Sequence, residues 1–338
     1  MKQIWIRKFG APSVLSVEEA PDPTPGPGEV RVRVEAAGVN FADLMARMGI
    51  YPDAPPRPLV VGYEVAGTVD AVGSGVDEKW VGKPVVSMTR FGGYSSVVTI
   101  PEVQVVERPD GLDAVTAASI PVTGLTAWMM LMEMGRIRAG DRVLVHSAGG
   151  GVGLSALDLL LWKGATAVGT ASAGKHDFLR ERGYHELVDY RTQDFKEVLK
   201  DGPKFDLILD PIGGASWAKG LDLLRSGGRL VCFGFSAQAT GNRSSVISTL
   251  RGVAAIPWLR INPVTLMNEN KGVMGVNMGH LWDEAARVAG WLRELMPLWE
   301  QGILRPQVHA TVPFSNAPEA HRILHDRENL GKVVLIPD

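Results

Sequence analysis

The first third of the chain is built from short runs in which apolar and polar residues alternate. Residues 1–8 and 29–35 (Glu-Val-Arg-Val-Arg-Val-Glu) have the period of two that is typical of half-buried strands. Residues 60–73 and 92–100 continue the strand pattern, and the Pro- and Gly-rich segment 21–28 acts as a connector. The pattern predicts a compact, barrel-like β domain over residues 1 to about 118.

The pattern changes near residue 112. Residues 113–135 have helical character, with Pro121 as a start or a kink. Strands and helices then alternate, with strands expected at residues 142–146, 165–170, 205–209 and 229–233, a further strand near 273–278, and a long helix at 283–301. This βαβ rhythm predicts an α/β, doubly wound parallel sheet over residues 119–299. Residues 246–267 are apolar and interrupted by proline, and no element is assigned to them.

The end of the chain returns to strand character at residues 310–314 and 332–336. We therefore expect residues 300–338 to rejoin the β domain.

Composition narrows the class of protein further. With 338 residues the chain is long enough for two domains, and its net charge of −2 gives no basic surface that favours nucleic acid. The sequence predicts no integral membrane segment and no signal peptide. Cys232 is the single cysteine, which excludes an internal disulfide and a cysteine-clustered structural zinc site. A cytoplasmic protein is expected.

A glycine-rich turn stands at the centre of the α/β part. The apolar run 143–145 leads through His146 into Ala148-x-Gly150-x-x-Gly153, and an apolar stretch of helical length follows. In a strand–turn–helix context, such glycines let the backbone approach a dinucleotide pyrophosphate, which the N–H groups of the helix then bind. Gly150, Gly151, Val152 and Gly153 are the expected cofactor contacts. The alternative is a turn that serves only helix-to-strand packing.

The segment after the next strand suggests which dinucleotide is bound. An NAD site has an Asp or Glu there, but residues 168–175 contain neither and offer Ser172 and Lys175. A hydroxyl and a cation suit a 2′-phosphate, which a carboxylate would repel, so NADPH is expected. The alternative for Lys175 is a solvated residue at a helix start.

At this point the chain resembles a known family. His146-Ser-Ala-Gly-Gly-Gly-Val-Gly153 is similar to the signature of the quinone oxidoreductases, the zinc-free branch of the medium-chain dehydrogenases/reductases. Nearly the whole chain takes part in the resemblance, through residues 37–43, 49–52, 124–127, 187–191, 210–214 and 331–335. Residues 170–176 and 270–279 resemble homologues of the vesicle amine transport protein more closely still. Gly149 departs from the signature, which has Ala there.

The resemblance implies a chaperonin-10-like β-barrel substrate domain and a Rossmann cofactor domain, with the active site in the cleft between them. It also implies a homodimer formed through the outer strands of the cofactor sheets, here near residues 273–278. Tyr190 matches a position near the adenosine 2′-phosphate. The remaining positions match segments near the nicotinamide: Asn40, Thr123, Phe233, Gly234, Val276, Asn277 and Met278. For Thr123, the alternative is a helix-capping or packing hydroxyl.

The same comparison implies chemistry without a metal. Asn40 stands where zinc-containing relatives have Cys, and Gly62-Tyr63-Glu64 stands where they have Gly-His-Glu, so a normal zinc ligand set is missing. Reduction of a conjugated C=C bond or of a quinone needs only hydride from the nicotinamide, a hydrogen-bond donor and a weak acid.

The resemblance also implies two catalytic candidates. By it, Tyr51 is expected to donate a proton or orient the substrate, and Asn40 to donate a hydrogen bond or hold the cofactor. Asp43 is expected to cap the same loop. Tyr63 and Trp258 are expected to line the substrate pocket, and the apolar region around Trp258 suits a small hydrophobic or aromatic carbonyl or quinone substrate. For Tyr51 the alternative is an aromatic residue that only shapes the pocket, and for the Trp258 region it is dimer or core packing.

The sequence thus favours a zinc-independent, NADPH-dependent oxidoreductase of quinones or α,β-unsaturated carbonyls. An enoyl thioester reductase is the related alternative. A non-catalytic NADPH-binding adaptor, like vesicle-associated homologues, is the alternative from a different class.

Overall fold

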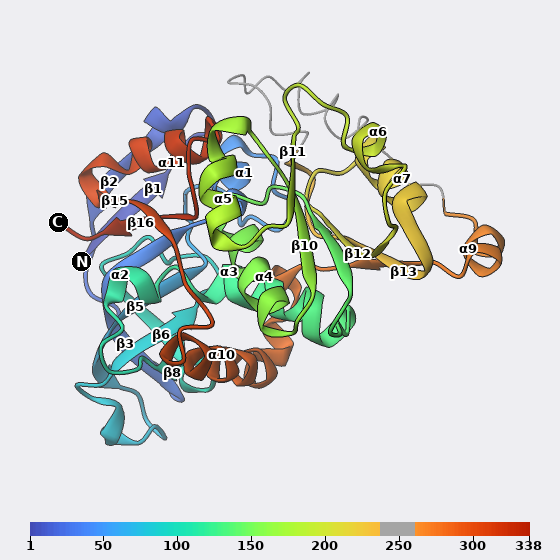
Figure 1. Ribbon diagram of the computed structural model, residues 1–338. Coiled ribbons are helices and arrows are strands. Elements are labelled where there is room, and N and C mark those ends of the chain that lie inside the picture. The colour runs from blue at the N-terminus through green and yellow to red at the C-terminus, as the bar shows by residue number, and fades with distance from the viewer. Residues whose placement is uncertain (237–260) are drawn as a thin grey trace. The chain divides into compact units, whose positions relative to one another are not determined.

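The structure is a computed structural model that describes residues 1–236 and 261–338 (Figure 1). The predicted pocket residue Trp258 lies outside the described residues. By their internal contacts, the described residues form two compact units. The first contains Met1–Leu125 and Met278–Asp338, and the second contains the described residues of 126–277.

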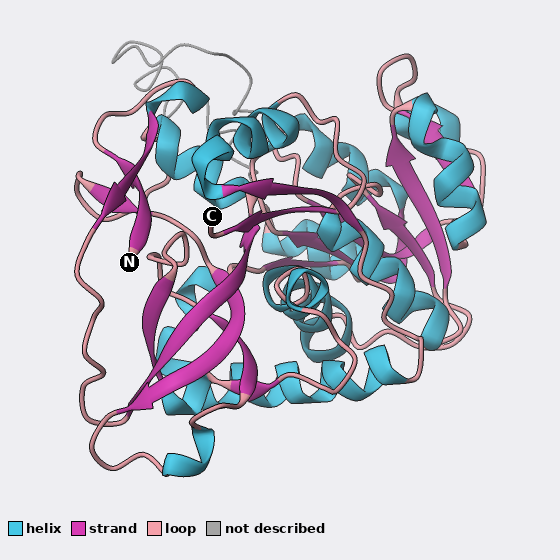
Figure 2. Ribbon diagram, turned by 90° about the vertical axis from the view of Figure 1, so that its left-hand side faces the viewer, coloured by secondary structure: helices cyan, strands magenta, loops and turns pink. Residues whose placement is uncertain are grey.

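The first unit is built on a seven-stranded sheet in the order β15-β16-β3-β5-β6-β8, with β7 paired to β3. A three-stranded sheet in the order β2-β1-β4 accompanies it, and Figure 2 shows the long, twisted strands. The strand bounds are β1 (Lys2–Ile6), β2 (Leu15–Glu19), β3 (Glu29–Val39), β4 (Leu59–Val60), β5 (Glu64–Val72), β6 (Pro84–Met88), β7 (Val97–Pro101), β8 (Val106–Glu107), β15 (Val308–Pro313) and β16 (Lys332–Ile336). The β-rich character predicted from the alternation of apolar and polar residues is therefore confirmed.

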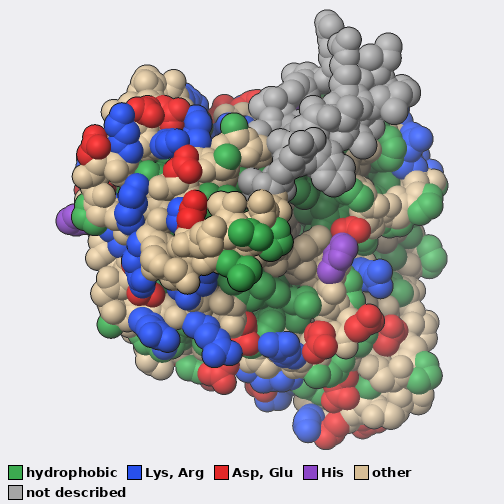
Figure 3. Space-filling model, turned by 90° about the vertical axis from the view of Figure 1, so that its right-hand side faces the viewer, with side chains coloured by type: hydrophobic (Ala, Val, Ile, Leu, Met, Phe, Trp, Pro, Cys, Tyr) green, Lys and Arg blue, Asp and Glu red, His purple; other side chains and the backbone are tan. Residues whose placement is uncertain are grey.

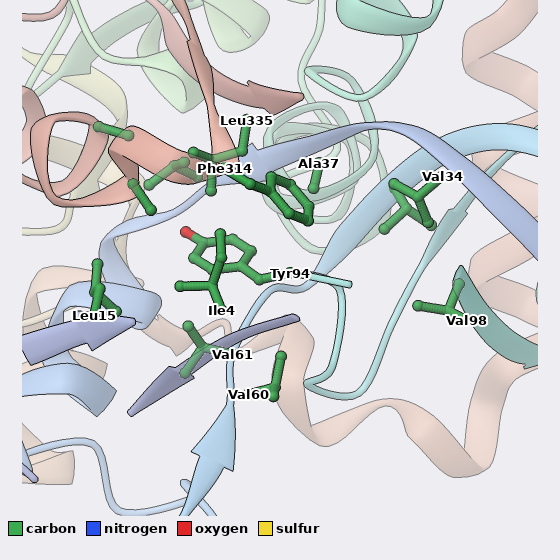
Figure 4. Packing of buried hydrophobic residues seen from close by; sticks show 14 of the residues in the cluster. Ile4, Leu15, Val34, Ala37, Val60, Val61, Tyr94, Val98, Phe314 and Leu335 are labelled. Carbon is green, nitrogen blue, oxygen red and sulfur yellow. The ribbon is translucent and has the colours of Figure 1, made fainter. Parts of the chain in front are cut away.

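The core of this unit forms where alternate residues of the strands turn inward. Val30, Val32 and Val34 of β3 are buried, whereas the arginines between them are not, as a half-buried strand requires. Tyr94 is fully buried within the same core, and Figure 4 shows its ring between Phe314 and Val61.

The C-terminal tail pairs with strands of the first unit. β16 pairs antiparallel with β3, so that Leu335 lies opposite Ala37. The helices of this unit are α1 (Phe41–Met48), α2 (Ala114–Ala117), α10 (Ala285–Glu300) and α11 (Ala317–His325). The sequence assigned residues 283–299 to the cofactor domain, but α10 packs against β8 and the short η3 helix (Glu102–Gln104) of the first unit.

The second unit is a six-stranded parallel sheet in the order β11-β10-β9-β12-β13-β14. Its strands are β9 (Arg142–Val145), β10 (Thr166–Ala171), β11 (Glu186–Asp189), β12 (Phe205–Asp210), β13 (Leu224–Cys232) and β14 (Gly272–Gly275). Its helices are α4 (Gly151–Trp162), α5 (His176–Arg182), α6 (Phe195–Leu199), α7 (Ala215–Leu223) and α9 (Pro263–Glu269). The predicted doubly wound parallel sheet is confirmed.

The apolar stretch before this sheet is helical and mostly buried. Pro121 starts α3 (Pro121–Trp128), because proline fits the first turn of a helix, where its missing N–H is not needed. The span Ala114–Met134 is long and apolar enough to cross a membrane by length and composition alone, which the sequence reading did not expect. However, 67% of its most apolar window is buried inside the structure, as in a core helix of a folded domain.

Candidate active site

The glycine turn joins β9 to α4 in the second unit. Gly150 is the N-cap of α4 in an extended conformation, and Gly151 begins the helix. A Cβ atom on Gly153 would lie 2.6 Å from the Ala148 carbonyl oxygen, closer than real Cβ contacts allow. Glycine at this position therefore lets the helix start against the end of the strand. This is the packing role that the fingerprint assigns to its last glycine.

The first turn of α4 supplies an anion-binding surface. An α-helix leaves its first N–H groups without intrahelical acceptors, here those of Gly151, Val152 and Gly153. The helix dipole adds partial positive charge at the same end. No side chain is present on Gly150 or Gly151 to obstruct a phosphate. This geometry fits a pyrophosphate.

A buried polar cluster lies behind the turn. His146 Nδ1 lies 3.0 Å from Thr170 Oγ1, and His146 Nε2 lies 4.0 Å from a carboxylate oxygen of Asp210. Burial lowers the pKa of His146, so the ring is neutral. Asp210 accepts hydrogen bonds from the backbone of Ile212 and from the Ser216 hydroxyl. These contacts join the ends of β9, β10 and β12 beneath the turn.

Sequence reasoning assigned no role to this cluster. Its only signal was that His146 and Asp210 occur in motifs shared with the resembling family.

The three residues predicted at the 2′-phosphate follow the carboxyl ends of the neighbouring strands β10 and β11. Ala171 at the end of β10 pairs with Asp189 at the end of β11, so Ser172 and Tyr190 follow neighbouring positions. Ser172 is 9% exposed and Tyr190 is 39% exposed. Lys175 ends the short helix that starts directly after Ser172. The carboxyl ends of parallel strands are where dinucleotides bind in such sheets, so the position suits the prediction.

The residues predicted at the nicotinamide also follow strand ends. Phe233 and Gly234 come after β13, and Val276 and Asn277 come after β14. The two segments run side by side, because Cys232 pairs with Gly275 and the Val276 N–H donates to the Cys232 carbonyl at 2.9 Å. Met278 is 7% exposed and belongs to the first unit by its contacts.

Asn40 is the N-cap of α1 in the first unit and is 8% exposed. Its backbone N–H donates to Asp43 at 2.8 Å, so Asp43 caps the loop as expected. The amide Nδ2 donates to Glu64 Oε1 at 2.8 Å, and a longer contact of 3.4 Å leads to the Gly38 carbonyl. The amide Oδ1 accepts from Lys332 at 2.8 Å. Most of the amide is therefore engaged within the protein.

Lys332, the first residue of β16, was not predicted as part of a site. Its ammonium is buried and donates to the Val39 carbonyl at 2.8 Å, to Asn40 Oδ1 at 2.8 Å and to Glu64 Oε1 at 2.5 Å. All three N–H groups thus have acceptors. Glu64 is fully buried, and its second oxygen accepts the Val122 N–H at 2.7 Å, in the first turn of α3. Burial is tolerated because the two charges are paired and hydrogen-bonded.

Thr123 follows Val122 in the same turn. Its hydroxyl donates to the Ser119 carbonyl at 2.8 Å, and the residue is 4% exposed. This bond is the packing role that was the alternative for Thr123. Its predicted place near the nicotinamide stays a prediction.

A second buried network lies behind α1. Asp43 is fully buried and accepts from the Gly62 N–H at 2.9 Å and from the Tyr94 hydroxyl at 3.2 Å. The Tyr94 hydroxyl also lies 3.2 Å from His321 Nε2. Burial raises the pKa of Asp43 to about 7, although the backbone N–H groups of Asn40 and Gly62 oppose the rise. Burial, together with the Arg47 charge, holds the pKa of His321 well below its usual range.

Three aromatic rings from separate loops of the first unit meet one another. The Tyr63 ring lies 6.2 Å from that of Tyr51, edge to face, and 5.0 Å from that of Phe91. Burial raises the pKa of both tyrosines, so both are protonated at neutral pH. Phe91 has a φ of 64°, uncommon for a bulky residue, and was not predicted from the sequence. The corner therefore combines aromatic ring surfaces with phenol hydroxyls.

The residue types around Asn40 do not form a metal site. Among residues 1–236 and 261–338, no group of three or more His, Cys, Asp or Glu side chains is arranged to hold a metal ion. The Lys332 ammonium lies against the Glu64 carboxylate, which contacts the Asn40 amide, and would repel a divalent cation there.

Comparison with known proteins places the chain among related sequences. Residues 26–110 match the alcohol dehydrogenase GroES-like domain, and residues 182–335 match the family described as zinc-binding dehydrogenase. The rat synaptic vesicle membrane protein VAT-1 homolog is 37% identical over 97% of this chain and 82% of its own length. A quinone oxidoreductase of Pseudomonas aeruginosa is 33% identical over 99% of both proteins.

A solved structure agrees with these sequence relatives. The crystal structure of Escherichia coli quinone oxidoreductase complexed with NADPH matches with a TM-score of 0.87 and 30% identity, and the match covers 100% of both chains. The first unit is therefore a GroES-like domain and the second a Rossmann-type domain, as the resemblance implied.

Proposed function

Because the chain belongs to the medium-chain dehydrogenase/reductase superfamily, in the branch that contains the VAT-1 homologues and the quinone oxidoreductases, we propose that it is an NADPH-dependent oxidoreductase. Its substrates are small hydrophobic or aromatic quinones or α,β-unsaturated carbonyls. The observation that carries the proposal is the glycine turn between β9 and α4, with hydroxyl and lysine side chains at the adjacent strand ends.

The fit to NADPH rests on the second unit. Gly150, Gly151, Val152 and Gly153 would hold the pyrophosphate, because the glycines allow the backbone to approach it and the helix N–H groups bind the anion. Ser172, Lys175 and Tyr190 would hold the 2′-phosphate. Phe233, Gly234, Val276, Asn277 and Met278 would contact the nicotinamide half. The E. coli relative with NADPH bound supports this assignment.

NADPH supplies hydride when it is bound. The contribution of the chain is to orient the acceptor and to handle the charge that develops on the substrate oxygen. Asn40 retains one amide N–H that makes only a 3.4 Å contact, and this N–H is the proposed donor. Tyr51 is the proposed proton donor or substrate-orienting hydroxyl, since its raised pKa keeps it protonated. Tyr63 and Phe91 would provide the apolar wall.

We further propose that the reaction needs no zinc. Asn40 and Tyr63 offer an amide and a phenol where zinc enzymes of the superfamily have a thiolate and an imidazole. The ammonium of Lys332 already neutralises Glu64. Stoichiometric zinc in the purified protein, found by metal analysis, would contradict this part of the proposal.

The experiment follows NADPH oxidation at 340 nm with a panel of quinones, enones and enoyl thioesters. We expect turnover with quinones or enones, and a loss of enone turnover in Tyr51→Phe with NADPH binding retained. Lys83→Met, which removes a surface ion pair to Glu107, is the control variant. Full enone activity in Tyr51→Phe would remove Tyr51 as the acid.

Two alternatives remain as outcomes of the same panel. Turnover of enoyl thioesters alone identifies an enoyl thioester reductase. Tight NADPH binding without turnover of any compound favours a cofactor-binding adaptor, which the VAT-1 homologues support as the second candidate function.

We also propose that the protein forms a homodimer through the outer strand β14. Met274 and Val273 lie on a strand that pairs with β13 on one side. Next to it in the sequence, α9 exposes Val264 (59%) and Met267 (74%). Figure 3 views the molecule from the side on which α9 lies in Figure 1, and apolar side chains gather near the middle of this face. The cytoplasmic location stays a prediction from the sequence.

A further inference from the structure

The amide of Asn40 has a chemical ambiguity that its neighbours resolve. An asparagine amide has nearly the same shape with its oxygen and nitrogen exchanged, so the hydrogen bonds decide which way it faces. Lysine can only donate hydrogen bonds, and a carboxylate can only accept them. Lys332 contacts one end of the amide and Glu64 contacts the other, at 2.8 Å each. The pair therefore selects one orientation, with Oδ1 toward Lys332 and Nδ2 toward Glu64.

This selection determines what Asn40 can offer to a bound molecule. One N–H of Nδ2 is directed to Glu64, and the other has only the 3.4 Å contact with the Gly38 carbonyl. Contacts of that length are weak hydrogen bonds. The available group is therefore a donor, which suits an electron-rich oxygen. In the reversed orientation the amide would present a carbonyl and would repel the same oxygen.

The pair is also built to hold its own position. Lys332 uses its third N–H on the Val39 carbonyl, directly before Asn40. The second oxygen of Glu64 accepts the Val122 N–H at the start of α3. Gly38 is needed here, because a Cβ atom at this position would overlap Glu64 Oε1 and the Ala118 carbonyl. Both charged groups are at most 6% exposed in their side chains, so water does not compete for these bonds.

We infer that Lys332 and Glu64 are positioning residues, which fix the Asn40 amide so that it presents an N–H to the oxygen of the substrate or to the cofactor. This inference rests on the proposed function for its chemistry. The orientation of the amide, however, follows from the hydrogen bonds alone and is measurable without any ligand.

The first experiment compares Lys332→Met, Asn40→Ala and the double variant in steady-state kinetics. If Lys332 acts through Asn40, either single change lowers kcat by about 10- to 100-fold, and the double variant is no worse than Asn40→Ala. If Lys332 acts independently, the two losses multiply, and the inference is overturned. Lys83→Met is the matched control, because it removes a lysine from an exposed pair in the same unit.

Lys332→Met leaves Glu64 buried without its partner and can unfold the protein, so a second variant is needed. Lys332→Met with Glu64→Gln removes both charges. A glutamine donates as well as accepts, and thus no longer selects the orientation of Asn40. We expect this variant to fold but to keep the reduced kcat. Recovery of wild-type kcat would mean that the pair serves stability only.

A third readout separates this inference from the proposed function. The side-chain amide of Asn40 is followed by NMR in asparagine-labelled, ligand-free protein. We expect the Asn40 resonances to shift in the doubly neutral variant and to stay in place in Lys83→Met. Unchanged resonances would refute the positioning role, even if no substrate is turned over. Absence of turnover with shifted resonances would instead count against the oxidoreductase proposal.

Discussion

Replacing Gly153 by alanine tests the cofactor turn most directly. The new Cβ atom would lie 2.6 Å from the Ala148 carbonyl oxygen and 2.7 Å from that of Ser147. Both neighbours are backbone atoms and cannot rotate away, so the start of α4 must move relative to the end of β9. Overpacking of this kind costs about 1–3 kcal/mol.

The two effects of this substitution can be measured separately. Part of the cost appears as a lower free energy of unfolding, measured with urea. The displacement of the N–H groups that face the pyrophosphate appears as weaker NADPH binding, measured by fluorescence titration. Loss of 1–3 kcal/mol of binding energy corresponds to about a 5- to 150-fold higher Kd.

Gly290→Ala is the matched control for this prediction. Gly290 lies inside α10, and a Cβ atom there meets nothing within 4 Å, so the change should preserve NADPH binding and raise stability slightly. If Gly153→Ala binds NADPH as tightly as the wild type, the turn does not hold the pyrophosphate, and the reasoning from its close packing fails.

Three further predictions concern other parts of the chain. Lys175→Ala should weaken NADPH binding by about 10- to 100-fold and leave NADH binding unchanged, because one charge-assisted contact to the 2′-phosphate is lost; equal losses for both cofactors in parallel titrations would disprove the assignment. Asp43 has its pKa raised to about 7 in the folded protein, so the folded state binds the proton more tightly than the unfolded state, and stability falls as pH rises from about 4 to 7. The contribution is at most roughly 4 kcal/mol, and urea unfolding across this pH range should show it missing in Asp43→Asn; the same pH slope in both proteins would exclude the buried carboxyl as its source. Met267→Glu, at a residue that is 74% exposed on α9, should convert the proposed dimer to a monomer in sedimentation, whereas Val198→Glu on α6 should not; a monomeric wild type would rule out the dimer.

Local patterns explain which parts of the fold could be predicted. The strand β9, the glycine turn and α4 follow one another directly between Arg142 and Trp162, so their character is readable without knowledge of the rest of the chain. The strand β11 was not predicted as a strand. It is only four residues long and lies at the edge of the sheet, so its sequence shows no clear alternation of apolar and polar residues. The sequence placed residues 283–299 in the cofactor domain, whereas their contacts place them in the first unit. A helical pattern does not tell which sheet the helix packs on.

The site residues could be suggested only where the family resemblance pointed to a side chain with suitable chemistry. Asn40 and Tyr51 were singled out because they match family positions where an amide and a phenol can act on a carbonyl. Lys332 was not, because a lysine at the start of an apolar strand normally reaches solvent. It meets Asn40 across a sequence separation of 292 residues, and only the pairing of β16 with β3 makes the contact. No periodicity reports such a pairing.

The position of Lys332 also sets an order of events during synthesis. Asn40, Glu64 and the start of α3 leave the ribosome long before residues 332–336 do. Until β16 joins β3, the Glu64 carboxylate has no ammonium beside it, and the Asn40 amide oxygen lacks its lysine donor. The first unit thus lacks the contacts of Lys332 with Asn40 and Glu64 while the whole Rossmann-type unit is being made. A chain that stops before β16 would contain a buried carboxylate without its partner and would expose the edge of β3. We therefore expect such truncated chains to be unstable rather than partly active.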